Sequence, residues 1–495
     1  MSLRTRIPAV VLIVFSAFAH SQTAAQKAAP PSSARAKQAR PPKFFPYPVH
    51  ERKLPNGLHV IVIPTPEFKD MVTYATPVFA GSRNEMEGGK TGLAHLFEHM
   101  MFRHEYGDQE GGYNEMIRRL GAYNNAFTNE DMTFYHPTTF SSNLIGPVKR
   151  GPESLPGIVE LEASRFKGLK VDTKTFQVEA GAVLGEYRRI YSFPFLKILE
   201  ALLPKAFPDH PYGHTVIGTQ QDVKDMPQAA DAAWRFFDDY YRPNNVAIVV
   251  VGDVQADAVF REVEQRYADW KPKPTRPIPP PSPPPGEKRV HAEDTSEVAP
   301  RLVVGYYSPA ADPGSVETAV IQVLPELLSS RSAPLFQKLR YQKQTVTDLS
   351  TFSDGMNVQP NSFTLSSELM LDRFNKEGKT YPAEVEKDMI SGLEDLKSFS
   401  RQPHAARTLD VVKSKVRNDL LGALNSTGSI ATIFSSAYQY NRDAYALDRM
   451  MAAIQRLRPA DIDAFARKYF QPGKRLIATL WKTPGAQSAP AKEGN

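Results

Sequence analysis

The residues best suited to chemistry form one short run, His95-Leu96-Phe97-Glu98-His99. In a helix, residues four apart lie on the same face about 5–6 Å apart, so the imidazoles of His95 and His99 can reach one metal ion. Neutral imidazole is a good zinc ligand, and zinc lowers the pKa of a bound water to about 7. Glu98 lies beside the same ion and can take the proton of that water. The run therefore predicts a hydrolytic zinc site, with two histidine ligands and Glu98 as general base.

The same run has a simpler interpretation, as ordinary surface or core residues of a helix. The chain has only 11 histidines, and this pattern arises by chance in about one in a hundred such sequences. A catalytic zinc takes three protein ligands, so a third ligand must lie elsewhere. Glu179 and Glu186 are seven residues apart, which is two helical turns and places both on one face. From the pattern alone, a solvated helix face explains this pair better than a metal site does.

The elements that position these residues can be predicted from the spacing of apolar side chains. Residues 91–102 carry apolar side chains at helical spacing, which predicts a helix around the histidines. Residues 113–120 and most of 155–190 also favour helix. Asn56-Gly57 favours a tight hairpin turn, and residues 125–135 favour an extended strand. Further strands are predicted at residues 246–251, 301–307 and 475–481.

A proline-rich segment divides the chain into two halves. Residues 271–286 contain nine prolines, and such a run acts as an extended, semi-rigid spacer. We expect an N-terminal domain over residues 44–270, a C-terminal domain over 287–482 and a disordered tail at 483–495. The linker is expected to let the two halves tilt. Strands and helices alternate in both halves, which indicates an α+β or α/β fold.

The N-terminus has the composition of an export signal. Arg4 and Arg6 precede an apolar run that extends from Ile7 to Ala19, and residues 1–25 are interpreted as a signal peptide. A membrane anchor is the alternative, but the run is shorter than the ~20 residues that span a bilayer. Residues 26–43 are expected to form a flexible arm. The mature protein is expected to be periplasmic or secreted, with no membrane span.

Composition excludes several kinds of site. The chain has no cysteine, so disulfides and thiol catalysis are ruled out, and any metal must have nitrogen and oxygen ligands. The net charge of +6 arises from 60 basic and 54 acidic residues, and no Lys/Arg run is typical of a nucleic-acid-binding stripe. We therefore expect no nucleic-acid partner.

Several segments, in the same order, resemble the insulinase/pitrilysin family of zinc metallopeptidases, and in particular its half-length bacterial and mitochondrial-processing-peptidase-like members. The His-x-x-Glu-His order of the first run is the inverted form of the zincin motif. The spacing of Glu179 and Glu186 matches the Glu-x(6)-Glu segment of that family. The other matching segments are Gly92-Leu93-Ala94, Asn125-Ala126-Phe127-Thr128 with Thr133 and Tyr135, His210-Pro211-Tyr212-Gly213 with Gly218-Thr219, Tyr241-Arg242-Pro243-Asn244-Asn245, Val250-Val251-Gly252-Asp253 and Leu335-Phe336-Gln337-Lys338-Leu339-Arg340.

The resemblance implies roles that the pattern alone leaves open. Glu186 would be the third zinc ligand, and Glu179 would support the site. The interval from His99 to Glu186 is longer than is usual in the family, and residues 146–156 look like a loop insertion that accounts for the difference. The implied fold is α+β, with two homologous α/β-sandwich halves that face each other as a clamp and are joined here by the proline-rich linker.

A substrate-binding edge is also implied. An extended peptide can add to a sheet edge through main-chain hydrogen bonds, which give affinity with little sequence preference. The resemblance places the predicted strand at 125–135 beside the zinc, and we expect Asn125, Ala126 and Phe127 to bind substrate. An interior strand without a special role is the alternative.

One position departs from the family pattern. Active members carry an arginine and, seven residues later, a tyrosine, which bind the substrate carbonyl and stabilise the oxyanion. Arg340 matches the arginine, but Thr347 stands in place of the tyrosine and is too short to replace it. The resemblance therefore implies a partner, a homologous subunit with an intact Arg/Tyr pair in a hetero-oligomer. A homodimer, or an active monomer that uses Tyr341 as a donor, is the alternative.

These residues predict a zinc-dependent endopeptidase with one Zn²⁺ per chain, which hydrolyses unfolded peptides as the zinc-bearing subunit of a complex. A non-catalytic structural subunit and a peptide-binding module of the same fold are the alternatives. Both alternatives predict that bound peptide is not cleaved.

Overall fold

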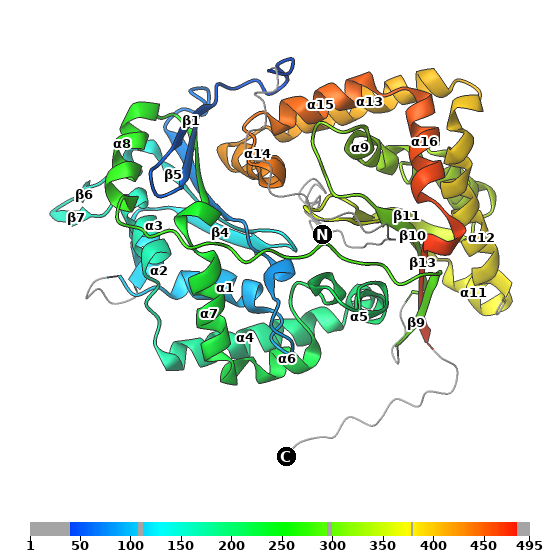
Figure 1. Cartoon of the computed structure of the whole chain (residues 1–495), viewed down its shortest axis with the longest axis horizontal. Coiled ribbons are helices and arrows are strands. Elements are labelled where there is room, and N and C mark those ends of the chain that lie inside the picture. Colours follow the sequence, from blue (N-terminus) through cyan, green and yellow to red (C-terminus); the bar gives the residue numbers. More distant parts are fainter. Residues whose placement is uncertain (1–39, 107–111, 295–298, 378–379, 483–495) are drawn as a thin grey trace, which may run out of the picture.

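The computed structural model describes residues 40–106, 112–294, 299–377 and 380–482. The predicted signal peptide (1–25), most of the predicted arm (26–43) and the predicted tail (483–495) lie outside the described residues. None of the helices in the described ranges has the length and apolar character needed to cross a membrane. The described chain forms two halves side by side, each with one mixed sheet and its helices (Figure 1).

The N-terminal half is built on a six-stranded sheet with strand order β1-β2-β8-β3-β5-β4. β2 and β8 are parallel, and the other neighbouring strands are antiparallel. Its strands are β1 (His50–Lys53), β2 (His59–Pro64), β3 (Met71–Val78), β4 (Tyr123–Thr128), β5 (Thr133–Phe140) and β8 (Ala247–Gly252). Its helices are α1 (Leu93–Met100), α2 (Gly112–Arg119), α3 (Ile158–Lys167), α4 (Thr173–Tyr191), α5 (Pro194–Ala206), α6 (Gln220–Asp225), α7 (Ala230–Tyr240) and α8 (Ala256–Tyr267).

The C-terminal half is built on a five-stranded sheet with strand order β11-β12-β10-β13-β9. Its strands are β9 (Lys288–Asp294), β10 (Arg301–Ser308), β11 (Val346–Asp354), β12 (Asn361–Leu369) and β13 (Arg475–Lys482). Its helices are α9 (Val316–Leu328), α10 (Pro334–Phe336), α11 (Leu371–Glu377), α12 (Thr380–Glu394), α13 (Ala405–Ala423), α14 (Thr427–Asn441), α15 (Ala446–Arg456) and α16 (Pro459–Tyr469).

The two sheets have the same topology. β9 and β13 are parallel, as β2 and β8 are, and the next three strands of each sheet are antiparallel in the same order. The edge strand β4 of the first sheet therefore corresponds to the edge strand β11 of the second. The predicted α+β clamp of two like α/β halves is confirmed.

Each half contributes one helix to the sheet of the other half. One face of the N-terminal sheet is covered by helices of its own half, including α1, α3, α7 and α8, and the opposite face packs against α14. In the same way, α5 packs against the C-terminal sheet, where Ile198 and Leu202 meet Val303 in one apolar cluster. Full burial of a large aliphatic side chain stabilises by about 1.5–3 kcal/mol, so the two exchanged helices hold the halves together.

The linker at residues 271–286 forms neither helix nor strand and crosses from the first half to the second (Figure 1). Asn244 donates a hydrogen bond from Nδ2 to the carbonyl oxygen of Lys273, at 2.8 Å. Gln359 of the second half donates from Nε2 to the carbonyl oxygen of Ile278, also at 2.8 Å. The linker is therefore held to the first half at Lys273 and to the second half at Ile278. The proposed domain boundary within it stays a prediction.

The strand predicted at residues 125–135 is wrong, because two strands occupy this stretch. β4 ends at Thr128 and β5 begins at Thr133. The side-chain oxygen of Asn129 accepts hydrogen bonds from the backbone N–H groups of Asp131 and Met132, at 2.9 and 2.7 Å. An Asn side chain that bonds to the following backbone favours a turn, and this turn reverses the chain into a hairpin.

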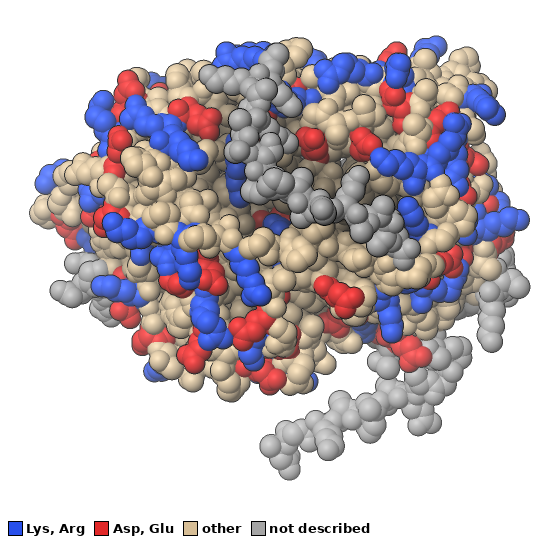
Figure 2. Space-filling view, in the orientation of Figure 1, with Lys and Arg blue, Asp and Glu red and all other residues tan. Residues whose placement is uncertain are grey.

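Other local predictions agree with the structure. The helix predicted at 91–102 is present as α1 followed by a short 3-10 turn, Met101–Arg103. The predicted Asn56-Gly57 turn joins β1 to β2, and Gly57 adopts a φ of +91°. The insertion at 146–156 forms a small hairpin of β6 (Val148–Arg150) and β7 (Glu153–Leu155). Lys/Arg and Asp/Glu side chains are interspersed across the face shown in Figure 2, without a stripe of one sign.

Candidate metal centre

Helix α1 presents its polar residues on one face because its apolar residues are buried on the other. Leu96, Phe97 and Met100 are fully buried, and the ring of Phe97 lies 5.7 Å from that of Trp234 on α7. This apolar anchor leaves His95, Glu98 and His99 turned toward α4. The predicted motif therefore lies on one helix face, as its spacing requires.

Helix α4 carries the two glutamates. The side chain of Asp172 caps its N-terminus by accepting a hydrogen bond from the Thr175 N–H, at 2.6 Å. Phe176, Ala180, Val183 and Tyr187 are buried in the N-terminal core. Glu179 and Glu186, two turns apart, face α1 across the gap between the helices.

Three side chains converge as a metal site would require. Glu186 Oε2 lies 3.7 Å from His95 Nε2 and 3.5 Å from His99 Nε2. One ligand atom from each of the three residues lies within 4.8 Å of the other two. A tetrahedral zinc with bonds of about 2.0–2.2 Å holds its ligand atoms about 3.3–3.5 Å apart. The spacing and the nitrogen and oxygen donors fit one Zn²⁺, with the fourth position left open.

Glu98 lies beside this group and is linked to the sheet. Its Oε2 is 3.9 Å from His95 Nε2 and accepts a hydrogen bond from the hydroxyl of Thr128, at 2.7 Å. Burial raises the pKa of Glu98, although the hydrogen bond from Thr128 lowers it. Thr128 is the last residue of β4. The carboxyl group is therefore held in place and has a raised proton affinity, as a general base needs.

Glu179 lies behind His99. Its Oε2 is 3.7 Å from His99 Nδ1, the ring nitrogen opposite the one near Glu186, and its Oε1 forms an ion pair with Arg103 Nε at 2.7 Å. Burial raises the pKa of Glu179. The hydrogen bond from His99 and the charge of Arg103 lower that pKa by a larger amount, so the net shift is downward. An ionised carboxylate at Nδ1 orients the imidazole and increases its basicity as a ligand.

The charges of the metal centre suit a cation. Burial and the neighbouring His99 lower the pKa of His95 to about 4, so its ring is neutral near pH 7. The hydrogen bond from His99 holds the pKa of Glu186 at about 2. Burial lowers the pKa of His99, but Glu179 and Glu186 outweigh it and raise that pKa to about 9. A metal ion would therefore displace one proton, from His99.

The residues predicted to bind substrate lie on an edge strand. β4 ends the strand order of its sheet, and Asn125, Ala126 and Phe127 pair only with β5 among the described strands. Ala126 is buried and shares a strand face with Thr128, toward α1. Phe127 points to the opposite face, where its ring lies 5.1 Å from that of Phe134. The edge nearest Glu98 is thus a strand with a free side.

Arg340 lies in the other half, on a π-helical turn at Gln337–Gln342. Its guanidinium lies 5.9 Å from the ring centre of Tyr341, whose side chain is exposed. The Thr347 hydroxyl donates a hydrogen bond to Glu368 Oε1, at 2.9 Å. Within the described ranges, no hydrogen bond or ion pair joins Arg340 to His95, to His99 or to the two glutamates of α4. The structure therefore brings together the predicted residues His95, Glu98, His99, Glu179 and Glu186, and it does not join Arg340 to them.

Two residues near the metal centre had no role in the sequence interpretation. Arg103 follows His99 by four residues, and the i,i+4 rule would have placed it on the same helix face. Thr128 alternates with Phe127, so the period of a strand would have turned its hydroxyl toward α1. Neither spacing rule would have predicted that Arg103 contacts Glu179 or that Thr128 contacts Glu98.

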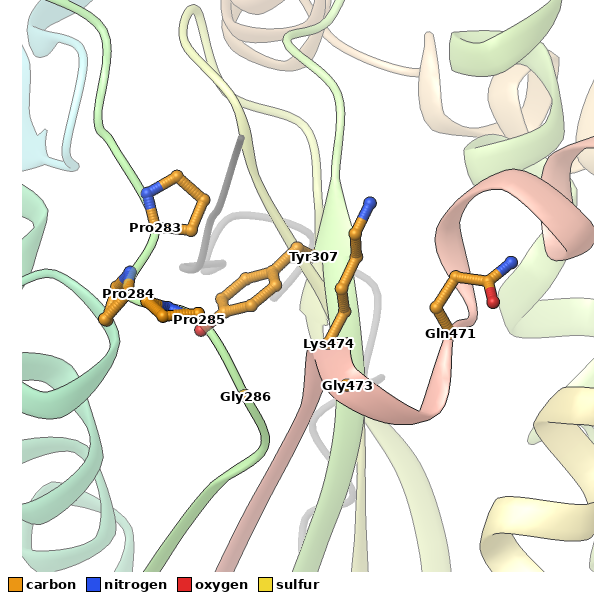
Figure 3. Close-up of a pocket in the computed structure, with 8 residues that line it drawn as sticks. All are labelled: Pro283, Pro284, Pro285, Gly286, Tyr307, Gln471, Gly473 and Lys474. Carbon is orange, nitrogen blue, oxygen red and sulfur yellow. The ribbon is translucent and has the colours of Figure 1, made fainter. Parts of the chain in front are cut away.

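A hollow of about 360 Å³ has none of the metal-centre residues in its lining. It is lined by the linker residues Pro283–Gly286 and by Tyr307, Gln471, Gly473 and Lys474 (Figure 3). Lys474 is the only charged residue in this lining, and no carboxylate or histidine contributes to it. The hollow is the space between the end of the linker and the C-terminal half.

Two family models match the chain. The model described as Insulinase (Peptidase family M16) matches residues 60–220, and the model described as Peptidase M16 inactive domain matches residues 229–398. The fold and the matches define a clamp of two like α/β halves of the M16 type. The chain belongs to the insulinase/pitrilysin family, peptidase family M16.

Individual relatives agree with this assignment. The zinc protease PqqE of Helicobacter pylori is 26% identical over 430 residues, which cover 86% of this chain and 91% of the relative. The probable mitochondrial-processing peptidase subunit beta of Arabidopsis thaliana is 26% identical over 222 residues, which cover 45% of this chain and 39% of the relative. The similarity to the Arabidopsis thaliana subunit therefore covers about half of this chain and less than half of that relative.

Solved structures share the fold. A protease from Helicobacter pylori superposes with a TM-score of 0.75 at 23% identity, over 88% of this chain and 100% of that chain. The periplasmic protease PqqL from Escherichia coli superposes with a TM-score of 0.67 at 17% identity, over 89% of this chain and 48% of that chain. This chain therefore spans about half of PqqL.

Proposed function

We propose that this protein is a zinc-dependent endopeptidase. The observation that carries the proposal is the convergence of His95, His99 and Glu186, whose ligand atoms lie within 4.8 Å of one another, beside the carboxyl group of Glu98. Zinc held there would lower the pKa of a water and polarise a peptide carbonyl.

The side chains have distinct tasks in this proposal. Glu98, fixed by Thr128, takes a proton from the attacking water and delivers it to the leaving amine. Glu179 keeps His99 in the tautomer and orientation that present Nε2 to the metal. Arg103 in turn holds Glu179. The supporting observations are that Glu98 accepts a hydrogen bond from Thr128 and that Glu179 forms an ion pair with Arg103, two side chains outside the ligand set.

Substrates are proposed to be unfolded peptides that add to β4. A free strand edge offers backbone N–H and C=O groups to an extended chain. Asn125, Ala126 and Phe127 would pair with the peptide, and Thr128 at the end of that strand would set its distance from Glu98. An unfolded peptide can offer its backbone groups to this edge without first breaking hydrogen bonds of its own.

We also propose a second subunit and an exported location. Thr347 cannot supply the tyrosine donor, and Arg340 has no contact with the metal centre among the described residues. A homologous subunit with an Arg/Tyr pair would complete the site, with a homodimer as the alternative. One relative is named as a mitochondrial-processing peptidase subunit and one structural neighbour as a periplasmic protease, and residues 1–25 have the composition of a signal peptide.

The test is a comparison of zinc content and peptide hydrolysis. The purified chain is expected to bind one zinc ion and to cleave a flexible fluorogenic peptide slowly, with activity lost on chelation. Loss of one oxyanion donor costs about 10²–10³ in rate, and a partner subunit should restore that factor. Zinc binding with no hydrolysis, alone or with any co-purifying partner, would establish the non-catalytic peptide-binding alternative instead.

A further inference from the structure

The N-terminus of α1, the helix that carries His95 and His99, is not capped by the side chain of its N-cap residue. The first N–H groups of any helix lack partners within that helix. α1 begins after Gly92, which adopts a left-handed φ of +84° and has no side chain to cap the turn. Two of the N–H groups at this end, those of Gly92 and Ala94, are instead bound by the side chain of Glu85. Gly92 N donates to Glu85 Oε2 and Ala94 N donates to Glu85 Oε1, each at 2.8 Å.

Glu85 is buried against a rigid surrounding. Its side chain is 0% exposed, and it follows the short helical turn Ser82–Asn84. The backbone of the 214–219 loop packs directly on this turn of α1, because a β-carbon on Gly92 would lie 2.5 Å from the carbonyl oxygen of Ile217. The helix start therefore has no room to move toward that loop, and Glu85 holds it through two hydrogen bonds.

The side chain of His214 also lies beside Glu85. His214 Nδ1 lies 3.0 Å from the carbonyl oxygen of Thr215, so this nitrogen carries the proton, and Nε2 is left as an acceptor. His214 Nε2 lies 3.7 Å from Glu85 Oε2. Burial raises the pKa of Glu85 to about 8, although the N–H groups of Ala94 and Gly92 lower it. Both the acid and the carboxylate keep two oxygens that accept N–H groups, whereas glutamine has one.

We propose that Glu85 is a positioning residue of the metal centre. It contacts neither metal nor substrate. Its two oxygens hold the first turn of α1, and Ala94 is adjacent to His95, so the carboxyl group sets where His95 meets Glu186. The inference rests on the proposed zinc site and deepens it. A residue outside the His95–His99 motif would control the distance between the zinc ligands.

The decisive variant is Glu85→Gln, with Glu87→Gln as its matched control. Glutamine has the same shape but must place an N–H₂ against Gly92 N–H or Ala94 N–H. Glu87 is two residues away, half exposed and paired with Arg235 at 3.0 Å. Zinc affinity is measured by chelator competition, and the ligand geometry is followed by the absorption spectrum of the Co²⁺-substituted protein. Circular dichroism checks that each variant is folded.

Glu85→Gln is expected to bind zinc about 10–100-fold more weakly, the loss typical of groups that act through a ligand, with a changed Co²⁺ spectrum. Glu87→Gln should match the wild type in both measurements. A folded Glu85→Gln protein with wild-type zinc affinity and spectrum would overturn the inference.

A measurement on the unaltered protein covers the case in which that variant does not fold. Amide hydrogen exchange at Gly92 and Ala94 should be as slow as at the interior residues of α1, and fast exchange at both would overturn the inference. If the wild-type chain binds no zinc, the proposed function fails, and the exchange rates still decide whether Glu85 holds the helix.

Discussion

Replacing Asp131 with asparagine should weaken the contact between the two halves. Its side chain is 3% exposed and accepts four hydrogen bonds. Oδ1 accepts from Arg83 Nε at 2.5 Å and from the Tyr212 hydroxyl at 3.1 Å, both within the N-terminal half. Oδ2 accepts from Asn357 Nδ2 at 3.1 Å and from the Val358 N–H at 2.9 Å, both in the turn between β11 and β12. One buried carboxylate thus joins the hairpin tips of the two sheets.

The size of the expected loss in unfolding free energy follows from the acceptor oxygen that asparagine lacks. Its single oxygen would stay with Arg83, because leaving a buried guanidinium unpaired is the larger penalty. The amide nitrogen would then face the donors of Asn357 and Val358, so two hydrogen bonds to a charged acceptor are lost. Each is worth about 1.5–3 kcal/mol, and the site is too buried for water to replace them. We expect the free energy of unfolding to fall by about 3–6 kcal/mol.

The assay is urea unfolding of four proteins, namely the wild type, Asp131→Asn, Asn357→Ala and the double variant. Residues in one hydrogen-bond network show interaction energies of about 0.5–3 kcal/mol in such a cycle. Asp257→Asn is the control, because Asp257 is 83% exposed and surface changes of this kind stay within about 0.5 kcal/mol. A loss below about 1 kcal/mol for Asp131→Asn, or strict additivity with Asn357→Ala, would refute the reasoning.

Three further predictions concern the metal centre. Glu98→Gln should lower hydrolysis by about 10²–10⁴-fold while metal analysis still finds zinc, and loss of zinc would contradict the role of base. Glu179→Gln should weaken zinc binding by about 10–100-fold in a chelator titration, and unchanged affinity would exclude its support of His99. Zinc affinity should rise about tenfold per pH unit until the pKa of His99, about 9, because the metal must displace that proton, and a flat profile would contradict this. The same raised pKa stabilises the metal-free protein fully below about 6.5, and the stabilisation is lost as pH rises through about 9.

Features set by neighbouring residues could be predicted from the sequence. The spacing of His95 and His99 placed both on one face of a helix, and Asn56-Gly57 placed a turn that needs a positive φ. The hairpin of β4 and β5 was missed, although the polar run Asn129-Glu130-Asp131 interrupts residues 125–135. An Asn side chain that bonds to the following backbone favours a turn, and this local signal was available in the sequence.

Contacts between distant residues could not be predicted. Glu85 caps a helix that begins eight residues later, and no local rule distinguishes it from the exposed Glu87. The pairing of Asp131 with Asn357 depends on two turns meeting in space, more than 200 residues apart. An apolar helix has the same periodicity whichever sheet it covers, so nothing in the sequence of α5 or α14 indicates that each packs on the opposite half.

The packing of α5 and α14, each on the sheet of the opposite half, bears on the predicted role of the linker. A proline-rich spacer between two halves suggests that they tilt against each other, and that motion was expected here. Tilting would have to withdraw α14 from the N-terminal sheet and α5 from the C-terminal sheet, exposing Ile430 and Phe434 on one and Ile198 and Leu202 on the other, all of them buried. Exposure of each large apolar side chain costs about 1.5–3 kcal/mol, and the four hydrogen bonds of Asp131 would break as well. The packing of α5 and α14 on the opposite halves therefore opposes such a tilt within the single chain.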